Sequence, residues 1–338
     1  MNIAILGAGA WGTALAISLA ARHQVTLWAR DAEQVAAMRT TRRNRRYLPD
    51  AELPESLLLE HDLQAAMRAA ELVVVAVPVS GLRATLQQIA HLPAPVGVVW
   101  LCKGFELETS LLPHQIVEEI LPVEFPRGAL TGPSFAQEVA RGLPTALTLA
   151  SVDGAFAQRT AKALHHPRLR IYSSTDVVGV EIGGAIKNVL AIAAGISDGM
   201  HMGLNARAAL LTRGLAEMTR LGLAMGGKAE TLGGLSGVGD LILTCTGDLS
   251  RNRQVGMLLA QHRSLPSILK ELGHVAEGVY TAREVQRVAQ RYGAEMPICQ
   301  AVYRVLYEGL DADKAVEALL SRAPGEEFVA TGKHPHIN

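Results

Sequence analysis

Up to about residue 175, short apolar runs alternate with segments of helical pattern. The candidate strands are Ile3–Leu6, Val25–Ala29, Leu72–Val77, Val96–Leu101, Ala146–Ala150 and Leu169–Tyr172. The helix-like stretches between them include Thr13–Ala21, Leu82–Ala90 and Leu111–Ile120. Continuous Val, Ile and Leu runs separated by helices are typical of parallel strands covered on both faces. The pattern therefore predicts an α/β unit built on a doubly wound, mostly parallel sheet.

Beyond Asp176 the strand-like runs disappear and the pattern becomes helical. The expected helices are Val177–Ser197, Ala206–Met225, Tyr280–Tyr292 and Ile298–Gly309. We therefore expect two domains, an α/β domain over residues 1–176 and an all-α domain over residues 177–338. Some of these helices are apolar on more than one face, so several neighbours or a partner subunit must cover them.

The composition excludes several classes of protein. The chain has 338 residues, of which 49% are apolar and 19% charged, which provides a large core. Lys and Arg number 32, as do Asp and Glu, so no general basic field attracts nucleic acid or a membrane surface. Cys102, Cys245 and Cys299 lie far apart, and the eleven histidines form no HExxH pair. We therefore expect no disulfide framework and no metal site.

The uncharged stretch from Ile3 to Ala21 is nearly long enough to span a membrane. However, no basic segment precedes it, and glycines interrupt it. A buried strand, a tight turn and a buried helix explain it better. We expect a cytoplasmic protein without membrane insertion.

A glycine-rich motif, Gly7-Ala8-Gly9-Ala10-Trp11-Gly12, joins the first strand to the first helix. In this context G-x-G-x-x-G indicates a dinucleotide site. Gly7 permits the tight turn, Gly9 admits the diphosphate to the backbone, and Gly12 lets the helix pack on the strand. The helix N-terminus offers free N–H groups to the anion. A merely flexible turn is the alternative.

The end of the second strand gives a mixed signal about the cofactor. Arg30 stands where an acid usually holds the ribose of NAD, and an arginine there suits the 2′-phosphate of NADP. Asp31 follows at once, and a solvated Arg30 is the alternative. The basic run at residues 42–46 is more often a solvated loop, although it could help to hold phosphate.

Two lysines and an aspartate are candidates for catalysis. Lys187 falls inside an apolar helix, where desolvation lowers the pKa of an amine, unless its side chain reaches solvent. Lys103 follows the strand Val96–Leu101, at the edge of the sheet where ligands bind. Two such ammonium groups would lower each other's pKa and polarise a carbonyl. Asp240 follows two glycines and is either a member of this group or a helix N-cap.

Ser250-Arg251-Asn252-Arg253 precedes the helical stretch Gln254–Ala260. Ser250 is expected to cap this helix, which leaves free N–H groups beside a guanidinium and a carboxamide. That combination suits a phosphate clamp, and a plain capped helix is the alternative.

Together these residues resemble the bacterial NAD(P)-dependent glycerol-3-phosphate dehydrogenase family. The resemblance covers nearly the whole chain, from Asn2 to about Tyr307, and its motifs follow the family's order. The motifs are Gly7-Ala8-Gly9-Ala10-Trp11-Gly12-Thr13-Ala14, Tyr47-Leu48-Pro49, Cys102-Lys103-Gly104, Leu130-Thr131-Gly132-Pro133-Ser134-Phe135-Ala136, Gly184-Ala185-Ile186-Lys187-Asn188, Gly237-Val238-Gly239-Asp240-Leu241 and Ser250-Arg251-Asn252.

The resemblance implies a Rossmann domain followed by a helical domain like that of 6-phosphogluconate dehydrogenase. It implies reversible reduction of dihydroxyacetone phosphate to sn-glycerol 3-phosphate for phospholipid synthesis, and it favours a homodimer. Lys187 would be the proton donor and acceptor. The substrate would be surrounded by Lys103, Gly132, Ser134, Lys187, Asp240, Ser250, Arg251 and Asn252. The cofactor would be lined by Ala10, Trp11, Arg30, Tyr47, Lys103, Ala136, Arg251, Val275 and Glu277, besides the glycines of the turn.

The chain departs from the family at Ala10, where many members carry Ser. A side-chain hydrogen bond is then lost, but the backbone donors of the turn remain. We expect both NADH and NADPH to serve, with NADPH preferred. Two other functions stay open, a β-hydroxyacid dehydrogenase whose Arg251 holds a carboxylate, and a non-catalytic dinucleotide sensor.

Overall fold

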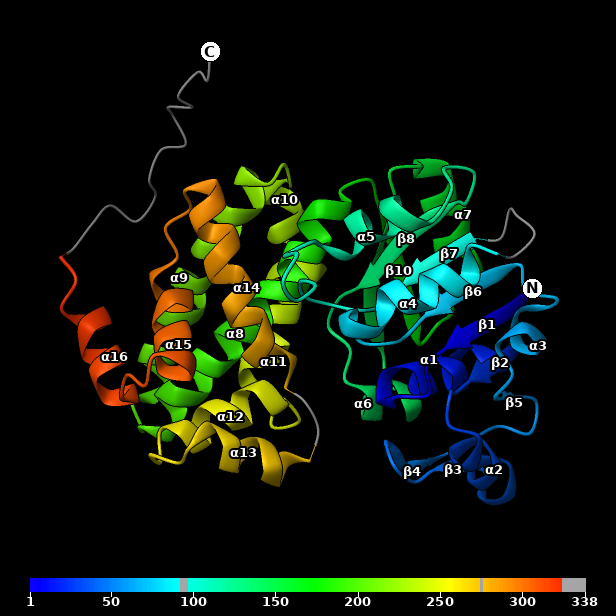
Figure 1. Ribbon diagram of the computed structural model, residues 1–338, viewed down its shortest axis with the longest axis horizontal. Coiled ribbons are helices and arrows are strands. Elements are labelled where there is room, and N and C mark those ends of the chain that lie inside the picture. Colours follow the sequence, from blue (N-terminus) through cyan, green and yellow to red (C-terminus); the bar gives the residue numbers. More distant parts are fainter. Residues whose placement is uncertain (92–96, 274–275, 324–338) are drawn as a thin grey trace, which may run out of the picture.

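The computed structural model describes residues 1–91, 97–273 and 276–323 (Figure 1). An α/β half and a helical half lie side by side, and the chain crosses between them once β10 has ended at Ser174. This arrangement confirms the expected fold class, a Rossmann-like N-terminal domain followed by an all-α C-terminal domain.

Eight strands form the main sheet, in the order β10-β9-β8-β7-β6-β1-β2-β5. Their bounds are β1 Asn2–Leu6, β2 Gln24–Trp28, β5 Leu58–Glu60, β6 Leu72–Val75, β7 Gly97–Trp100, β8 Arg127–Thr131, β9 Thr145–Ala150 and β10 Leu169–Ser174. All neighbouring strands run parallel except β8 and β9. A small antiparallel sheet pairs β3 (Arg43–Asn44) with β4 (Leu48–Glu52).

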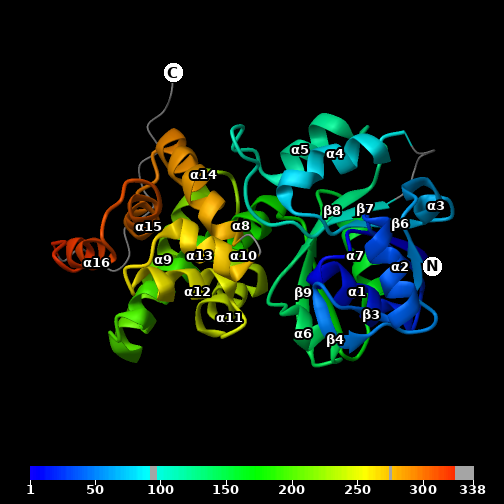
Figure 2. The ribbon, with the colours of Figure 1, turned by 60° about the horizontal axis from the view of Figure 1, so that its bottom comes forward.

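Helices cover both faces of the sheet, and Figure 2 shows the layers nearly edge-on. On one face α4 (Val79–Ile89) and α5 (Pro113–Ile120) pack over the central strands. On the other face α1 (Ala10–Ala20) and α7 (Gly154–Leu164) enclose a second core. The remaining helices of this half are α2 Ala32–Thr41, α3 Leu63–Met67 and α6 Ala136–Ala140.

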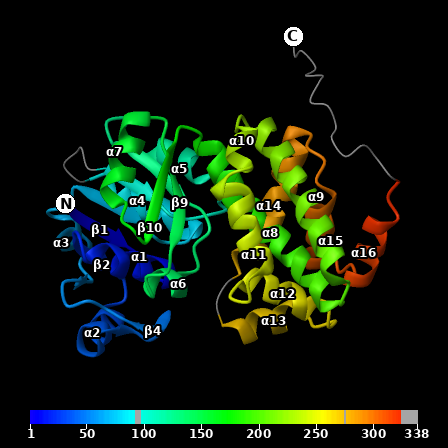
Figure 3. The same cartoon turned by 180° about the vertical axis from the view of Figure 1, so that it is seen from behind.

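The helical half packs around α8 (Val177–Gly199), which lies at its centre in Figures 1 and 3. The surrounding helices are α9 Gly203–Ala224, α10 Ala229–Leu232, the π-helix η1 Leu235–Gly239, α11 Asp240–Thr246, α12 Arg251–Leu259, α13 Leu265–Leu272, α14 Glu277–Tyr292, α15 Pro297–Tyr307 and α16 Ala312–Leu320. By length and composition α8 could cross a membrane, but nearly all of it is buried inside the protein. It is the core helix of this half.

The expected strands exist, but the sequence pattern did not predict all strands of the sheet. β8 escaped notice because its five residues include Arg127 and Gly128, which leave too short an apolar run. The reversal of β9 also escaped notice, because a run of apolar residues does not reveal strand direction. The first helix begins at Ala10, inside the glycine motif and earlier than expected. Val96, the first residue of one expected strand, lies outside the described residues.

Candidate active site

Lys103, Lys187 and Asp240 meet where the two halves of the protein face each other. The Lys187 ammonium lies 2.5 Å from Asp240 Oδ1, and the Lys103 ammonium lies 2.6 Å from Oδ2. The three side chains come from the loop after β7, from α8 and from the first turn of α11. Asp240 is only 1% exposed and Lys187 is 8% exposed. The alternative of Lys187 reaching solvent is therefore wrong, and Asp240 pairs with lysines instead of capping a helix.

The electrostatics of this cluster follow from its burial. Desolvation lowers the pKa of Lys187 to about 8, with Lys103 acting in the same direction and Asp240 opposing it. Desolvation alone would raise the pKa of Asp240, but the two ammonium groups hold it below its ordinary value. An amine with a pKa near neutrality can both donate and accept a proton at physiological pH.

Thr244 is a further member of the cluster that the sequence did not single out. Its hydroxyl lies one helical turn after Asp240, accepts a hydrogen bond from Lys187 Nζ at 2.9 Å and donates to the Asp240 carbonyl at 2.6 Å. The four-residue spacing on α11 was the available signal, because residues i and i+4 share one helix face. The two contacts hold the Lys187 ammonium in place.

The end of β8 forms one wall of the site. The carbonyl oxygen of Gly132 accepts hydrogen bonds from Lys103 Nζ at 3.2 Å and from the Ser134 hydroxyl at 3.1 Å. Gly132 has φ +140°, a backbone conformation that favours glycine. The expected grouping of Lys103, Gly132 and Ser134 is therefore present.

Ser250, Arg251 and Asn252 stand at the start of α12. The Ser250 hydroxyl caps the helix by accepting a hydrogen bond from the Arg253 N–H, as expected. Arg251 is exposed, and within the described part of the chain its guanidinium forms no hydrogen bond or salt bridge, although its charge acts on the Glu277 carboxyl. Arg253 is committed elsewhere, to Asp198 at 2.7 Å. Of the two guanidinium groups, that of Arg251 is therefore available to an anion.

Asn252 is held by hydrogen bonds at both ends of its carboxamide. Its side-chain N–H donates to Asn188 Oδ1 at 3.0 Å, and its side-chain oxygen accepts from the Gly278 N–H at 3.0 Å. Asn188 neighbours Lys187 on α8, and Gly278 lies in the first turn of α14. Asn252 thus connects the start of α12 to α8 and to α14.

Glu277 begins α14, and desolvation raises the pKa of its carboxyl while Arg251, Lys103 and Lys187 oppose the rise. The carboxyl is thus electrostatically coupled to the two lysines and to the start of α12. Val275, another expected cofactor residue, lies outside the described residues.

The glycine motif forms the turn between β1 and α1. Gly7 has φ +124°, and a Cβ there would lie 2.7 Å from the Ala76 carbonyl oxygen. A Cβ on Gly12 would collide with the Gly7 carbonyl oxygen, whereas one on Gly9 would meet no atom within 4 Å. Thr13 N makes the first bond of α1, to the Gly9 carbonyl oxygen. The amides of the first turn, ahead of Thr13, therefore face an open cradle that fits a diphosphate.

The other expected cofactor residues lie around this turn. Trp11 and Ala136 share an apolar cluster with Leu48, the neighbour of Tyr47. The Tyr47 ring stacks under the guanidinium of Arg46, 5.2 Å from its centroid. The basic run at residues 42–46 includes β3 and the start of the turn that follows it.

Arg30 is exposed at the C-terminal end of β2. The neighbouring carboxylate of Asp31 caps α2 by accepting hydrogen bonds from the N–H groups of Glu33 and Gln34. Asp31 is thus the cap of α2, and its other carboxylate oxygen lies 3.8 Å from the Arg46 guanidinium; Arg30 and Asp31 are both exposed.

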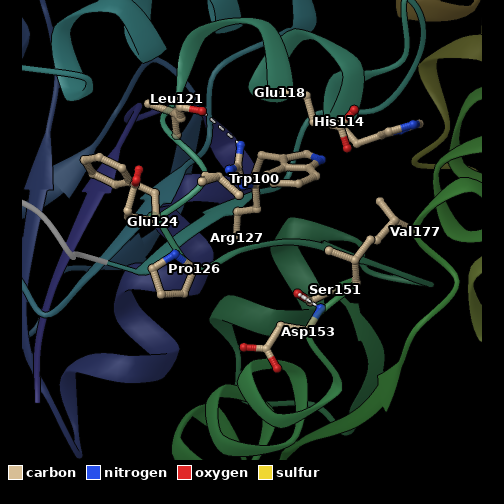
Figure 4. Close-up of a pocket in the computed structure, with 13 residues that line it drawn as sticks. Trp100, His114, Glu118, Leu121, Glu124, Pro126, Arg127, Ser151, Asp153 and Val177 are labelled. Carbon is tan, nitrogen blue, oxygen red and sulfur yellow. Dashed lines mark hydrogen bonds between the residues drawn. The ribbon is translucent and has the colours of Figure 1, made fainter.

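A separate cavity of about 500 Å³ lies between α5 and the turn that follows β9 (Figure 4). Trp100 and His114 line it, and both bind the buried carboxylate of Glu181. Glu118, Glu124 and Asp153 stand at its rim. Arg127 lines it as well, whereas Lys103, Lys187 and Asp240 do not, so this cavity is distinct from the lysine cluster.

Comparison with known proteins identifies the family. Residues 2–157 match the NAD-dependent glycerol-3-phosphate dehydrogenase N-terminus, and residues 176–317 match the corresponding C-terminus. A glycerol-3-phosphate dehydrogenase (NAD(P)+) of Thiobacillus denitrificans is 62% identical over 97% of this chain and 100% of its own length.

Solved structures agree with this match. The crystal structure of the Coxiella burnetii glycerol-3-phosphate dehydrogenase has a TM-score of 0.91 at 42% identity and covers 95% of this chain and 99% of that one. D-mandelate dehydrogenase, at 18% identity and a TM-score of 0.60 over 93% of this chain and 99% of its own, shares the fold alone. The chain therefore belongs to the bacterial NAD(P)-dependent glycerol-3-phosphate dehydrogenase family.

Proposed function

We propose that the protein reversibly reduces dihydroxyacetone phosphate to sn-glycerol 3-phosphate with NAD(P)H, which supplies glycerophospholipid synthesis. The observation that carries this proposal is the buried Lys187, whose ammonium is held by Asp240 and Thr244 beside a second lysine. Such a group can protonate the oxygen of a ketone as that carbon is reduced. The choice of substrate follows from the similar proteins, which are named glycerol-3-phosphate dehydrogenases.

Lys187 acts as general acid in the reduction and as general base in the reverse reaction. When bound, the nicotinamide cofactor supplies the hydride that reaches the ketone carbon. Lys187 Nζ gives a proton to the developing alkoxide, and Lys103 adds positive potential at the same oxygen. Asp240 orients both ammonium groups and keeps Lys187 charged in a buried setting. Gly132 and Ser134 border the substrate at the end of β8.

The substrate phosphate binds at the start of α12. The N-terminal N–H groups of α12 and the exposed guanidinium of Arg251 form a local anion site in a chain without net charge. Ser250 shapes this site as the helix cap. Asn252, which also contacts the substrate in this proposal, is positioned by Asn188 and Gly278.

The dinucleotide binds over the turn Gly7–Gly12, with Ala10, Trp11, Tyr47 and Ala136 around it. Lys103, Arg251 and Glu277 would complete the cofactor site, together with Val275, which lies outside the described residues. Exposed Arg30 pairs with the 2′-phosphate of NADPH, while Asp31 is engaged as a helix cap. Both cofactors therefore serve, and NADPH is preferred.

We further propose a cytoplasmic homodimer and a domain boundary at residues 176 and 177. Asp176 caps α8, directly after the last strand, which supports the boundary. Exposed apolar side chains such as Leu204, at 74% exposure on α9, support a partner surface on the helical half.

Oxidation of NADPH and NADH in the presence of dihydroxyacetone phosphate tests the function. Unphosphorylated dihydroxyacetone and a β-keto acid are the matched comparison substrates. We expect turnover of the phosphate ester and strong discrimination against both comparison substrates. Equal use of the two dihydroxyacetones would contradict the phosphate clamp, preference for the keto acid would favour a β-hydroxyacid dehydrogenase, and binding without turnover would favour a dinucleotide sensor.

A further inference from the structure

The loop that carries Lys103 belongs to the α/β half but is fastened to the helical half. This loop, residues 101–112, connects β7 to α5. Its residues Phe105 and Leu112 are 5% and 0% exposed and are buried in the core of the helical half. Gly104 approaches α14 so closely that a Cβ there would lie 3.0 Å from Thr281 Oγ1. The segment around Lys103 is therefore packed against α14.

A buried polar contact completes this attachment. The Ser110 hydroxyl donates to Glu284 Oε2 on α14 at 2.6 Å, with the two residues 3% and 0% exposed. Arg287 also binds the Glu284 carboxylate, at 3.0 Å. A fully buried carboxylate depends on each of its donors, because an unmet charge in the interior is costly.

The backbone of the loop is held in an unfavourable conformation. Ser110 has φ +58°, and Glu108 has φ +72°. Non-glycine residues adopt this region at a cost, and they persist there only when the surroundings fix them. Two contacts fix Ser110: its N–H donates to the Glu106 carbonyl at 3.0 Å within the loop, and its hydroxyl donates to Glu284 on α14.

The α14 helix links this loop to the other side of the active site. Its first turn is bound by Asn252 through the Gly278 N–H, next to the Arg251 guanidinium. Glu284 lies on the same helix, about two turns further along. One rigid helix thus fixes the start of α12 relative to the loop that carries Lys103.

We infer that Ser110 and Glu284 form an interdomain latch that positions Lys103 for catalysis. Ser110 and Glu284 are positioning residues, since neither touches the Lys103–Asp240–Lys187 cluster. This inference rests on the proposed function only through the role given to Lys103.

A double-mutant cycle tests the latch. Ser110→Gly removes the hydroxyl and suits a positive φ, so the variant folds without added backbone strain. We expect it to lower kcat for dihydroxyacetone phosphate about tenfold, as small misplacements of catalytic groups do. Combined with Lys103→Ala, the same substitution should change kcat by less than about twofold, because no lysine is left to misplace.

Two matched variants sharpen the test. Glu284→Gln keeps an oxygen for Ser110 and should retain kcat within about threefold, whereas Glu284→Ala should match Ser110→Gly. Thr109→Ala removes a hydroxyl that binds Glu106 within the loop itself, at 2.7 Å, and should leave kcat unchanged.

The outcomes separate the latch from the proposed function. Equal losses from Ser110→Gly in both backgrounds would make Ser110 merely structural and overturn the latch, as would a wild-type kcat for Ser110→Gly. If Lys103→Ala alone kept wild-type kcat, the role of Lys103 would fail and the latch with it.

Discussion

Replacing Asp240 by Asn tests whether one carboxylate sets the charge of both active-site lysines. Asn keeps the size of the side chain and an oxygen acceptor but removes the negative charge. In the protein that charge lies 2.5 Å from Lys187 and 2.6 Å from Lys103, and it is almost fully buried. Without it, desolvation and Lys103 both continue to lower the pKa of Lys187, and only hydrogen bonds oppose them.

The size of the effect follows from Coulomb's law. Two unit charges about 4 Å apart interact by about 4 kcal/mol at an effective dielectric constant of 20. Since a pKa unit corresponds to about 1.4 kcal/mol, full loss of the pair would lower the Lys187 pKa by up to about three units. Hydrogen bonding by Asn and structural relaxation reduce this, so we expect at least about one unit below the wild-type value of about 8.

The pH profile of kcat for ketone reduction measures this pKa in the substrate complex. The acid must be protonated, so kcat should fall as pH rises through about 8 in the wild type and at least about one unit lower in Asp240→Asn. Protonation alone then makes the variant about fivefold slower at pH 8 and nearly equal at pH 6. Asp248→Asn, which removes a 97% exposed carboxylate, is the matched control. A parallel or upward-shifted profile for Asp240→Asn would refute the argument.

The remaining predictions concern single groups. Lys187→Ala should lower kcat by about 10²- to 10⁴-fold with cofactor Kd nearly unchanged, and a variant above about a tenth of wild-type kcat would exclude general acid catalysis. Arg251→Ala should lower kcat/KM at least about tenfold, which steady-state kinetics would show, and a smaller loss would contradict the clamp. Arg30→Ala should weaken NADPH by about 1–3 kcal/mol and leave NADH within a few-fold, whereas equal losses in the two Kd values would mean that Arg30 stacks on adenine. Burial raises the pKa of Glu217 from 4.5 to about 7. The native state therefore holds this proton up to a higher pH than the unfolded state does. As a result, the free energy of unfolding falls by about 3 kcal/mol as pH rises from about 4.5 to 7. Glu217→Gln should reduce the fall of the thermal unfolding midpoint between pH 5 and pH 8, and an unchanged pH dependence would refute the raised pKa.

The sequence was informative where local chemistry has few alternatives. Gly7 was predicted because the tight turn there needs a conformation that favours glycine, and Gly12 because close packing of the helix leaves no room for a side chain. Both constraints are present. Lys187 was predicted because an ammonium inside an apolar helix needs a partner. The Ser250 cap was predicted because a serine directly before a helical stretch commonly caps the N-terminus of the helix.

Contacts between distant segments could not be read in this way. Asp240 fits a helix N-cap by local pattern, and only the approach of α8 and of the Lys103 loop makes it a counter-ion. Thr244 and Asn188 looked like ordinary helix residues, because their partners lie on other helices. The Ser110–Glu284 contact joins residues 174 positions apart, and no periodicity predicts such a pair.

The charges around the site explain how a neutral chain can bind a doubly charged phosphate. The chain has equal numbers of acidic and basic residues, so attraction must come from their arrangement. Lys103, Lys187 and Arg251 supply three positive charges, and Asp240 cancels one of them. The raised pKa of Glu277 lessens the fraction of that carboxyl that is negative at a given pH. The positive groups thus outnumber the negative ones, and because they stand at the start of α12 and at the lysine pair, we expect one orientation of the substrate, with the phosphate at Arg251 and the ketone at Lys187.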